Sequence, residues 1–205
     1  MNTGDTGEFE HAHLEQWLET TRHYLFFDQE SLADAAEKTL PESRLDSHGA
    51  QDHFISRTRG RLLRLVKCAA QQDQNPLQEL ERAFYFQVLF LSRHPYVPKR
   101  LMGWLAHGGN LRIRRRIQMV IDHYESRLCR MIERAKHQGF IRGDVEPQTA
   151  ASLFVGLIQC LALRINADLR QRELLLREAT GVFALYRAGI ASPLKLHQAK
   201  RISYQ

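Results

Sequence analysis

The 205-residue chain contains little cysteine and no long apolar run, and each scarcity excludes a class of protein. Its three cysteines, Cys68, Cys129 and Cys160, are isolated and odd in number, so they form neither a CxxC motif nor a disulfide framework. This usage is typical of a reducing compartment, and we expect a cytoplasmic protein. The longest apolar stretch, Ser152 to Leu163, is too short to span a bilayer and contains Gln159. We therefore expect no membrane association.

Positive charge is scarce at the beginning of the chain. Residues 1–54 carry three basic and twelve acidic side chains, a net charge of −9, whereas the remaining residues carry +15 and make the whole chain +6. DNA binding draws much of its affinity from phosphate neutralisation by Lys and Arg. The acidic segment therefore argues against tight DNA binding. Residues 55–67, with five basic side chains and no acid, are the exception, and they form either a phosphate-binding or a solvated face.

Apolar side chains recur at helical spacing along nearly the whole chain, and no segment reads convincingly as a strand. The clearest stripe begins at Ile113 and ends at Ala135, with Gly139 as a plausible cap. Residues 83–91, "AFYFQVLFL", are apolar nearly all round, which indicates a buried helix. Further helices are expected from Ile55, at 97–106, at 147–169 and at 172–188. The sequence predicts an all-α fold of about nine helices.

Three groups of residues resemble parts of the tetracycline-repressor (TetR) family. Gly139, Ile141-Arg142, Asp144, Pro147, Ala150-Ala151 and Gly156-Leu157 match the ligand and dimer domain of that family in type and spacing, and "LSRHPYVPKRLMG" (Leu91 to Gly103) is similar to the segment that leads into it. Near the beginning, Ser47, Gly49, His53-Phe54 and Ser56-Arg57 match the family's recognition helix. The resemblance implies a helix-turn-helix domain on a helical ligand-binding and dimerisation domain. We expect these at residues 1–60 and 61–190, followed by a flexible basic tail at 191–205.

The helix-turn-helix departs from the family pattern. "LPESRLD" is inserted before Ser47, and Asp52 lies where the family has an aromatic residue. Because turn length determines how the second helix enters the major groove, we expect weak or altered DNA specificity. The predicted DNA-contacting residues are Ser47, His48, Gln51, His53, Arg57, Arg59 and Arg61.

Two further sets of residues carry the rest of the prediction. Aromatic and histidine side chains in the 80–130 region are expected to line an apolar ligand pocket: Phe84, Phe86, Phe90, Trp104, His107, His123 and Tyr124. The apolar and small residues of the last two helices are expected to form a homodimer interface: Ala150, Ala151, Phe154, Leu157, Ile158, Leu161, Val182, Phe183 and Tyr186.

No nucleophile, base and orienting group occur together, so we expect no enzyme, and we expect neither a metal site nor a cofactor. The favoured function is a homodimeric transcription regulator whose helical domain binds a small hydrophobic or amphipathic ligand. The alternative is a TetR-like helical dimer that has lost specific DNA binding and acts through ligand or protein contacts.

Overall fold

The computed structural model describes residues 48–70, 75–107, 110–164 and 169–193, with side chains throughout except at residues 48, 107 and 169–173. All of these residues belong to one of the two compact units of the chain, Ser47–Gln205; the other unit, Met1–Asp46, lies outside the described residues. Six helices and no strand occur in the described ranges, so the all-α prediction is confirmed for them. The expected total of about nine helices includes segments before residue 48 and is not tested. No helix within the described ranges combines the length and apolarity that a membrane span requires.

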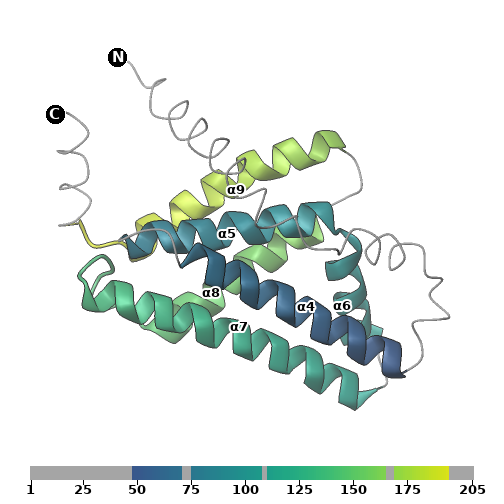
Figure 1. Ribbon diagram of the computed structural model, residues 1–205. Helices are drawn as coiled ribbons and strands as arrows, with labels where there is room; N and C mark the ends of the chain where they lie inside the picture. Colours follow the sequence, from purple (N-terminus) through teal and green to yellow (C-terminus); the bar gives the residue numbers. More distant parts are fainter. Residues whose placement is uncertain (1–47, 71–74, 108–109, 165–168, 194–205) are drawn as a thin grey trace. The chain divides into compact units, whose positions relative to one another are not determined.

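Helix α5 (Pro76–Arg93) lies at the centre of the bundle (Figure 1). Asn75 caps the N-terminus of the helix, because its side chain accepts a hydrogen bond from the Leu77 N–H. Pro76 occupies the first turn, where no N–H is needed. Nearly every side chain from Ala83 to Ser92 is buried, as the apolar run predicts. The helix contacts α4 (His48–Ala69), α7 (Leu111–His137), α8 (Pro147–Leu163) and α9 (Leu169–Ile190).

Helix α7 confirms the predicted stripe. Its buried residues are Ile113, Ile117, Val120, Tyr124, Leu128, Met131, Ile132 and Ala135. The side chain of Asn110 caps the first turn, and Gly139 follows the last turn with a φ of 75°, a left-handed conformation that glycine adopts without strain. The next residues return to α9: the Arg142 N–H donates to the Ile190 carbonyl and the Ser192 N–H donates to the Phe140 carbonyl.

Helices α8 and α9 differ from their predicted limits. Helix α8 begins at Pro147 as expected but ends at Leu163, before the predicted residue 169, and α9 extends from Leu169 to Ile190 instead of 172–188. Both pack on α5 through aromatic rings. The Phe84 ring centroid lies 5.3 Å from those of Phe154 and Phe183, and the Tyr186 hydroxyl donates to the Ala150 carbonyl.

Helix α4 begins earlier than expected. The sequence places a helix from Ile55 behind a turn-like stretch, but the structure has one uninterrupted helix from His48 to Ala69. The family-like residues from Gly49 to Arg57 thus occupy its first turns, and the expected domain boundary between residues 60 and 61 lies within it. Helix α4 runs alongside α7 in the same direction (Figure 1). Helix α6 (Tyr96–His107) agrees closely with its predicted range of 97–106.

Candidate functional site

An apolar cavity of about 90 Å³ lies where α4, α6 and α7 meet α5 and α8. Its walls are mostly aliphatic, and each of these five helices contributes to them. The lining residues are Ile55, Thr58, Leu62, Gln87, Leu91, Val97, Pro98, Leu101, Met102, Leu105, Ile117, Val120, Ile121, Tyr124, Val155 and Gln159. Such a lining, mostly apolar with few polar groups, is typical of small-molecule sites.

Two polar atoms in these walls are buried without a partner. The Tyr124 hydroxyl and the Gln87 Oε1 atom make no hydrogen bond with any described residue. Tyr124 is 3% exposed and Gln87 6% exposed. A buried polar group without a partner costs folding free energy, about 1–3 kcal/mol by mutational measures. These atoms are therefore the places where a ligand gains most from a complementary hydrogen bond.

The chemistry of the cavity favours a neutral ligand. None of the described residues that line it carries a charge, and burial raises the pKa of the Tyr124 phenol well above its usual range, so it stays protonated. A protonated phenol donates a hydrogen bond, whereas Gln87 Oε1 only accepts one. A hydroxyl group on an apolar body can accept a hydrogen bond from the phenol and donate one to an amide oxygen, so it suits either atom. A carboxylate finds no cation among these residues.

The size of the cavity limits the ligand. Small-molecule sites commonly measure about 300–1,000 Å³, whereas this cavity has room for little more than a single ring. Met102, a flexible side chain, lies in the wall contributed by α6, where a larger ligand would displace it.

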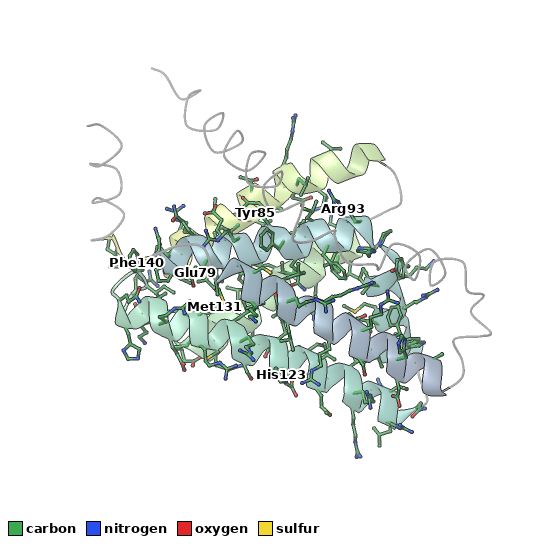
Figure 2. All side chains as sticks on the ribbon, in the orientation of Figure 1. Glu79, Tyr85, Arg93, His123, Met131 and Phe140 are labelled. Carbon is green, nitrogen blue, oxygen red and sulfur yellow. The ribbon has the colours of Figure 1, made fainter. Side chains whose placement is uncertain are left out.

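The predicted pocket residues lie in several places. Tyr124 lines the cavity, but Phe84, Phe86 and Phe90 are buried outside its lining. Trp104 packs its ring against Phe54, with centroids 5.4 Å apart. His123 lies on the α7 surface, where its Nδ1 atom is 3.1 Å from an Arg59 nitrogen (Figure 2). The side chain of His107 is outside the described residues. Prediction from aromatic density therefore identified the region but only one of the lining side chains.

Sequence reasoning missed the polar residues of the cavity, above all Gln87 and Thr58. A usable signal was present: Gln87 is the only amide side chain in the otherwise aliphatic and aromatic run "AFYFQVLFL". A polar residue on a helix buried on all sides requires a partner or a ligand, because its amide cannot reach water.

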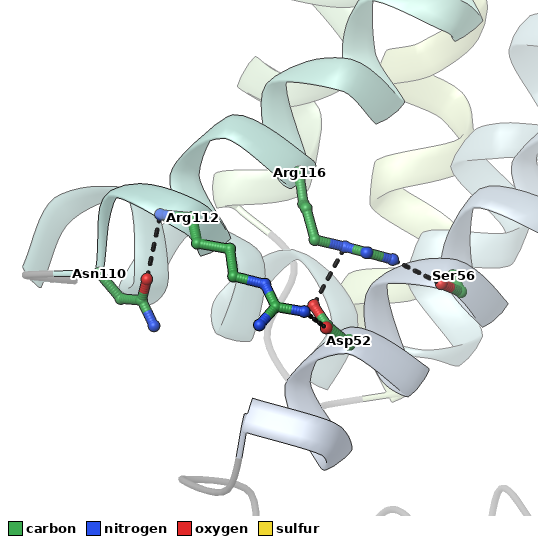
Figure 3. Close-up of polar contacts among 5 residues, drawn as sticks. All are labelled: Asp52, Ser56, Asn110, Arg112 and Arg116. Atoms are coloured by element: carbon green, nitrogen blue, oxygen red, sulfur yellow. Dashed lines mark hydrogen bonds and ion pairs between the residues drawn. The ribbon is translucent and has the colours of Figure 1, made fainter.

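The seam between α4 and α7 is polar at its beginning (Figure 3). Asp52 lies 2.6 Å from an Arg112 nitrogen and 3.0 Å from Arg116 Nε, and Arg116 also donates to the Ser56 hydroxyl. Asp52, which lies where the family has an aromatic residue, thus pairs with two arginines of α7.

The predicted DNA-contacting residues differ in the exposure of their side chains. His53 and Arg59 are exposed, Gln51 and Arg57 are partly buried, and Arg61 is buried at 6% exposure. Ser47 and the His48 side chain lie outside the described residues. Because Arg61 is buried, it does not belong to a phosphate-binding face.

The predicted dimer residues are largely inside the single chain. Those that are buried are Ala150, Ala151, Phe154, Ile158, Leu161, Phe183 and Tyr186, whereas Leu157 and Val182 are partly buried. The physical reason is packing within the chain: α8 packs against both α7 and α5, and α9 packs against α5, so their larger apolar stripes are covered by these helices. These seven side chains are buried within the single chain, and the opposite faces of the two helices are the ones that remain exposed.

Those opposite faces carry exposed leucines and small residues. Leu153 and Leu163 on α8 are 53% and 71% exposed, and Leu174 and Leu185 on α9 are 63% and 77% exposed. Between them lie exposed small residues: Gly156, Cys160, Gly181 and Ala184. An ion pair from Arg164 to Glu178 joins the end of α8 to α9, so the two faces are neighbours.

The described residues contain no group of three or more His, Cys, Asp and Glu side chains arranged to hold a metal ion. No family model matches the sequence, and no curated protein matches it. The structure is similar to that of the ketosteroid transcriptional regulator KstR2 of Mycobacterium tuberculosis, with a TM-score of 0.55 over 93% of this chain and 97% of that chain. The two sequences are 12% identical, so the likeness is one of fold. The chain therefore has an all-helical fold similar to that of a transcriptional regulator.

Proposed function

We propose that this protein is a TetR-like homodimeric transcription regulator whose helical domain binds a small, neutral, mostly apolar ligand. The observation that carries the proposal is the apolar cavity, with its two unpartnered polar atoms on Tyr124 and Gln87. The fold similarity to a solved transcriptional regulator supports the same function, as do the TetR-like residues at 49–57 and 139–157.

Helix α4 connects the cavity with the expected DNA-binding segment. It supplies Ile55, Thr58 and Leu62 to the cavity wall, and its first turns carry the residues that resemble the family's recognition helix. A ligand that displaces α4 therefore also displaces these family-like residues in its first turns. A ligand shifts such an equilibrium only by its difference in affinity for the two states.

The dimer is proposed to form through the exposed faces of α8 and α9. Exposed leucines flanked by small residues allow close approach of two helices from each chain, and their apolar surface gains from being covered. A two-fold dimer uses the same face of both chains, which agrees with a continuous leucine-bearing surface on neighbouring helices.

A pair of single-ring probes tests the ligand site. Phenol carries a hydroxyl group where toluene carries a methyl group of similar size. The protein should therefore bind phenol more tightly in calorimetric titrations. Tyr124→Phe and Gln87→Leu should remove that preference, whereas Tyr85→Phe, a change at a buried tyrosine outside the cavity lining, should retain it. Binding of neither probe, or equal effects of all three variants, would contradict the ligand site.

Selection of DNA from a random duplex library, followed by mobility shifts at physiological salt, tests the regulator itself. A palindromic site released by ligand supports the full proposal. The alternative, a TetR-like dimer without specific DNA binding, has one structural observation in its favour. Asp52 is held by α7 and Arg61 is buried, so the start of α4 offers few groups for reading bases. Absence of any selected site would favour this alternative.

A further inference from the structure

A second cleft, with a volume of about 470 Å³, opens between α4 and α7 beyond their polar seam. Gly60, Leu63, Arg64, Val66, Lys67 and Ala70 line it from α4 and the residue after it, and Arg127, Arg130, Met131 and Arg134 line it from α7. The volume is within the range of small-molecule sites, about 300–1,000 Å³. It shares none of its lining residues with the apolar cavity.

The cleft combines an apolar floor with a cationic rim. Val66 and Met131 are each 5% exposed, whereas Lys67, Arg127 and Arg130 are exposed. Figure 2 shows Met131 on α7 beside α4. No carboxylate is among the described residues that line the cleft. Arg134 forms an ion pair with Glu79, whereas Lys67, Arg127 and Arg130 form no ion pair with a described residue.

The cleft differs in charge from the seam that precedes it. At the beginning of the helix pair, the Asp52 carboxylate on α4 forms ion pairs with Arg112 and Arg116 on α7 and offsets part of their charge. Helix α4 has no acidic residue after Asp52, so farther along its cations face those of α7. Like charges across such a narrow gap repel each other, and a bound anion converts that repulsion into attraction.

We propose that this cleft binds a small organic phosphate with two or more negative charges and an apolar or planar body. Arginine presents its donors as a planar fork that matches phosphate oxygens, and lysine adds a point charge. Met131 on the floor provides the polarisable surface that suits a planar ring. The site goes beyond the regulator proposed above, because it is separate from the apolar cavity and accepts the opposite kind of ligand.

Calorimetric titration of the full-length protein with ATP in magnesium-free buffer tests the site, with adenosine as the probe that lacks phosphates. ATP should bind at one site per chain, at least about tenfold more tightly than adenosine, because charge-assisted hydrogen bonds supply most of the affinity. The double variant Arg127→Ala, Arg130→Ala should weaken ATP binding by at least about tenfold.

Arg114→Ala, Arg115→Ala is the matched control. It removes the same charge from the same helix at exposed positions outside the cleft, and it should alter ATP affinity less than about twofold. If both double variants weaken ATP binding equally, the effect comes from the overall charge of the protein and not from the cleft, and the proposal is overturned. Failure of ATP to saturate, together with duplex DNA binding that depends on Arg127 and Arg130, would make the cleft a nucleic-acid contact and overturn it as well.

Discussion

The ion pair between Glu79 and Arg134 should respond unequally to removal of its two partners. The Glu79 side chain is 6% exposed, whereas that of Arg134 is 46% exposed. Burial raises the pKa of the Glu79 carboxyl, and Arg134 offsets part of that increase through its charge and its hydrogen bond. Glu79 is thus the partner that depends on the pair, because Arg134 remains in contact with water.

Arg134→Ala leaves a buried carboxylate without its cation. The expected cost is about 2–3 kcal/mol in the free energy of unfolding at neutral pH, below the usual cost for a fully buried pair because one partner is half exposed. Glu79→Gln removes the charge that needed compensation and leaves an arginine that water can solvate. We expect it to cost less than about 1 kcal/mol.

The pH dependence follows from the direction of the pKa change. A carboxyl with a raised pKa in the folded state contributes stability that is present below its ordinary pKa and is lost as the pH rises through the folded value. Without Arg134 the pKa of Glu79 rises further. The cost of Arg134→Ala should therefore be largest at neutral pH and shrink towards pH 4.5.

Urea unfolding at equal protein concentration, at pH 7 and pH 4.5, measures these differences. The double variant Glu79→Gln, Arg134→Ala should be more stable at pH 7 than Arg134→Ala alone. Equal costs for the two single variants, or a cost of Arg134→Ala that does not change with pH, would refute the reasoning.

Three further changes test other parts of the structure. Tyr124→Phe removes a buried hydroxyl without a partner and should leave the unliganded protein as stable or up to about 1 kcal/mol more stable in urea; a loss above that size would mean that the hydroxyl is paired. Leu185→Arg should convert the proposed dimer to a monomer in light scattering, whereas Met119→Arg, at another exposed apolar residue on α7, should not; a monomeric parent protein would contradict this. Asp52→Asn should cost less than about 1 kcal/mol, because its ion pairs are partly exposed, and the difference should fall as salt rises in thermal unfolding.

The helices could be predicted from the sequence wherever apolar spacing was regular. The stripe of α7 predicted its buried face almost residue by residue, because each inward position is aliphatic or aromatic. Pro147 marked the start of α8 correctly, since proline is tolerated in the first turn. The start of α4 was misplaced because Gly49 suggested a turn, whereas the structure accommodates it in the helix.

The sites were harder to predict because they depend on which face meets which helix. Helix α8 has apolar residues on more than one side, and Phe154 was predicted to face a partner chain, whereas the structure packs its ring against Phe84 of α5 and leaves Leu153 exposed. The basic residues of α4 also looked alike in sequence, yet Arg61 is buried and Lys67 is exposed. The spacing of residues in the sequence does not distinguish these outcomes, because packing against other helices determines which face of a helix is buried.

Helix α4 forms one wall of each of the two sites: Leu62 borders the apolar cavity and the adjacent Leu63 borders the cationic cleft. Two ligands that share a rigid wall are thermodynamically linked, and the factor by which the first changes the affinity of the second equals the factor by which the second changes the affinity of the first. A displacement of α4 that enlarges one site by the width of a methyl group also changes the dimensions of the other site, because close-packed helices transmit strain. If both proposed sites bind their ligands, we therefore expect a neutral apolar molecule and an organic phosphate each to change the affinity of the protein for the other by the same factor.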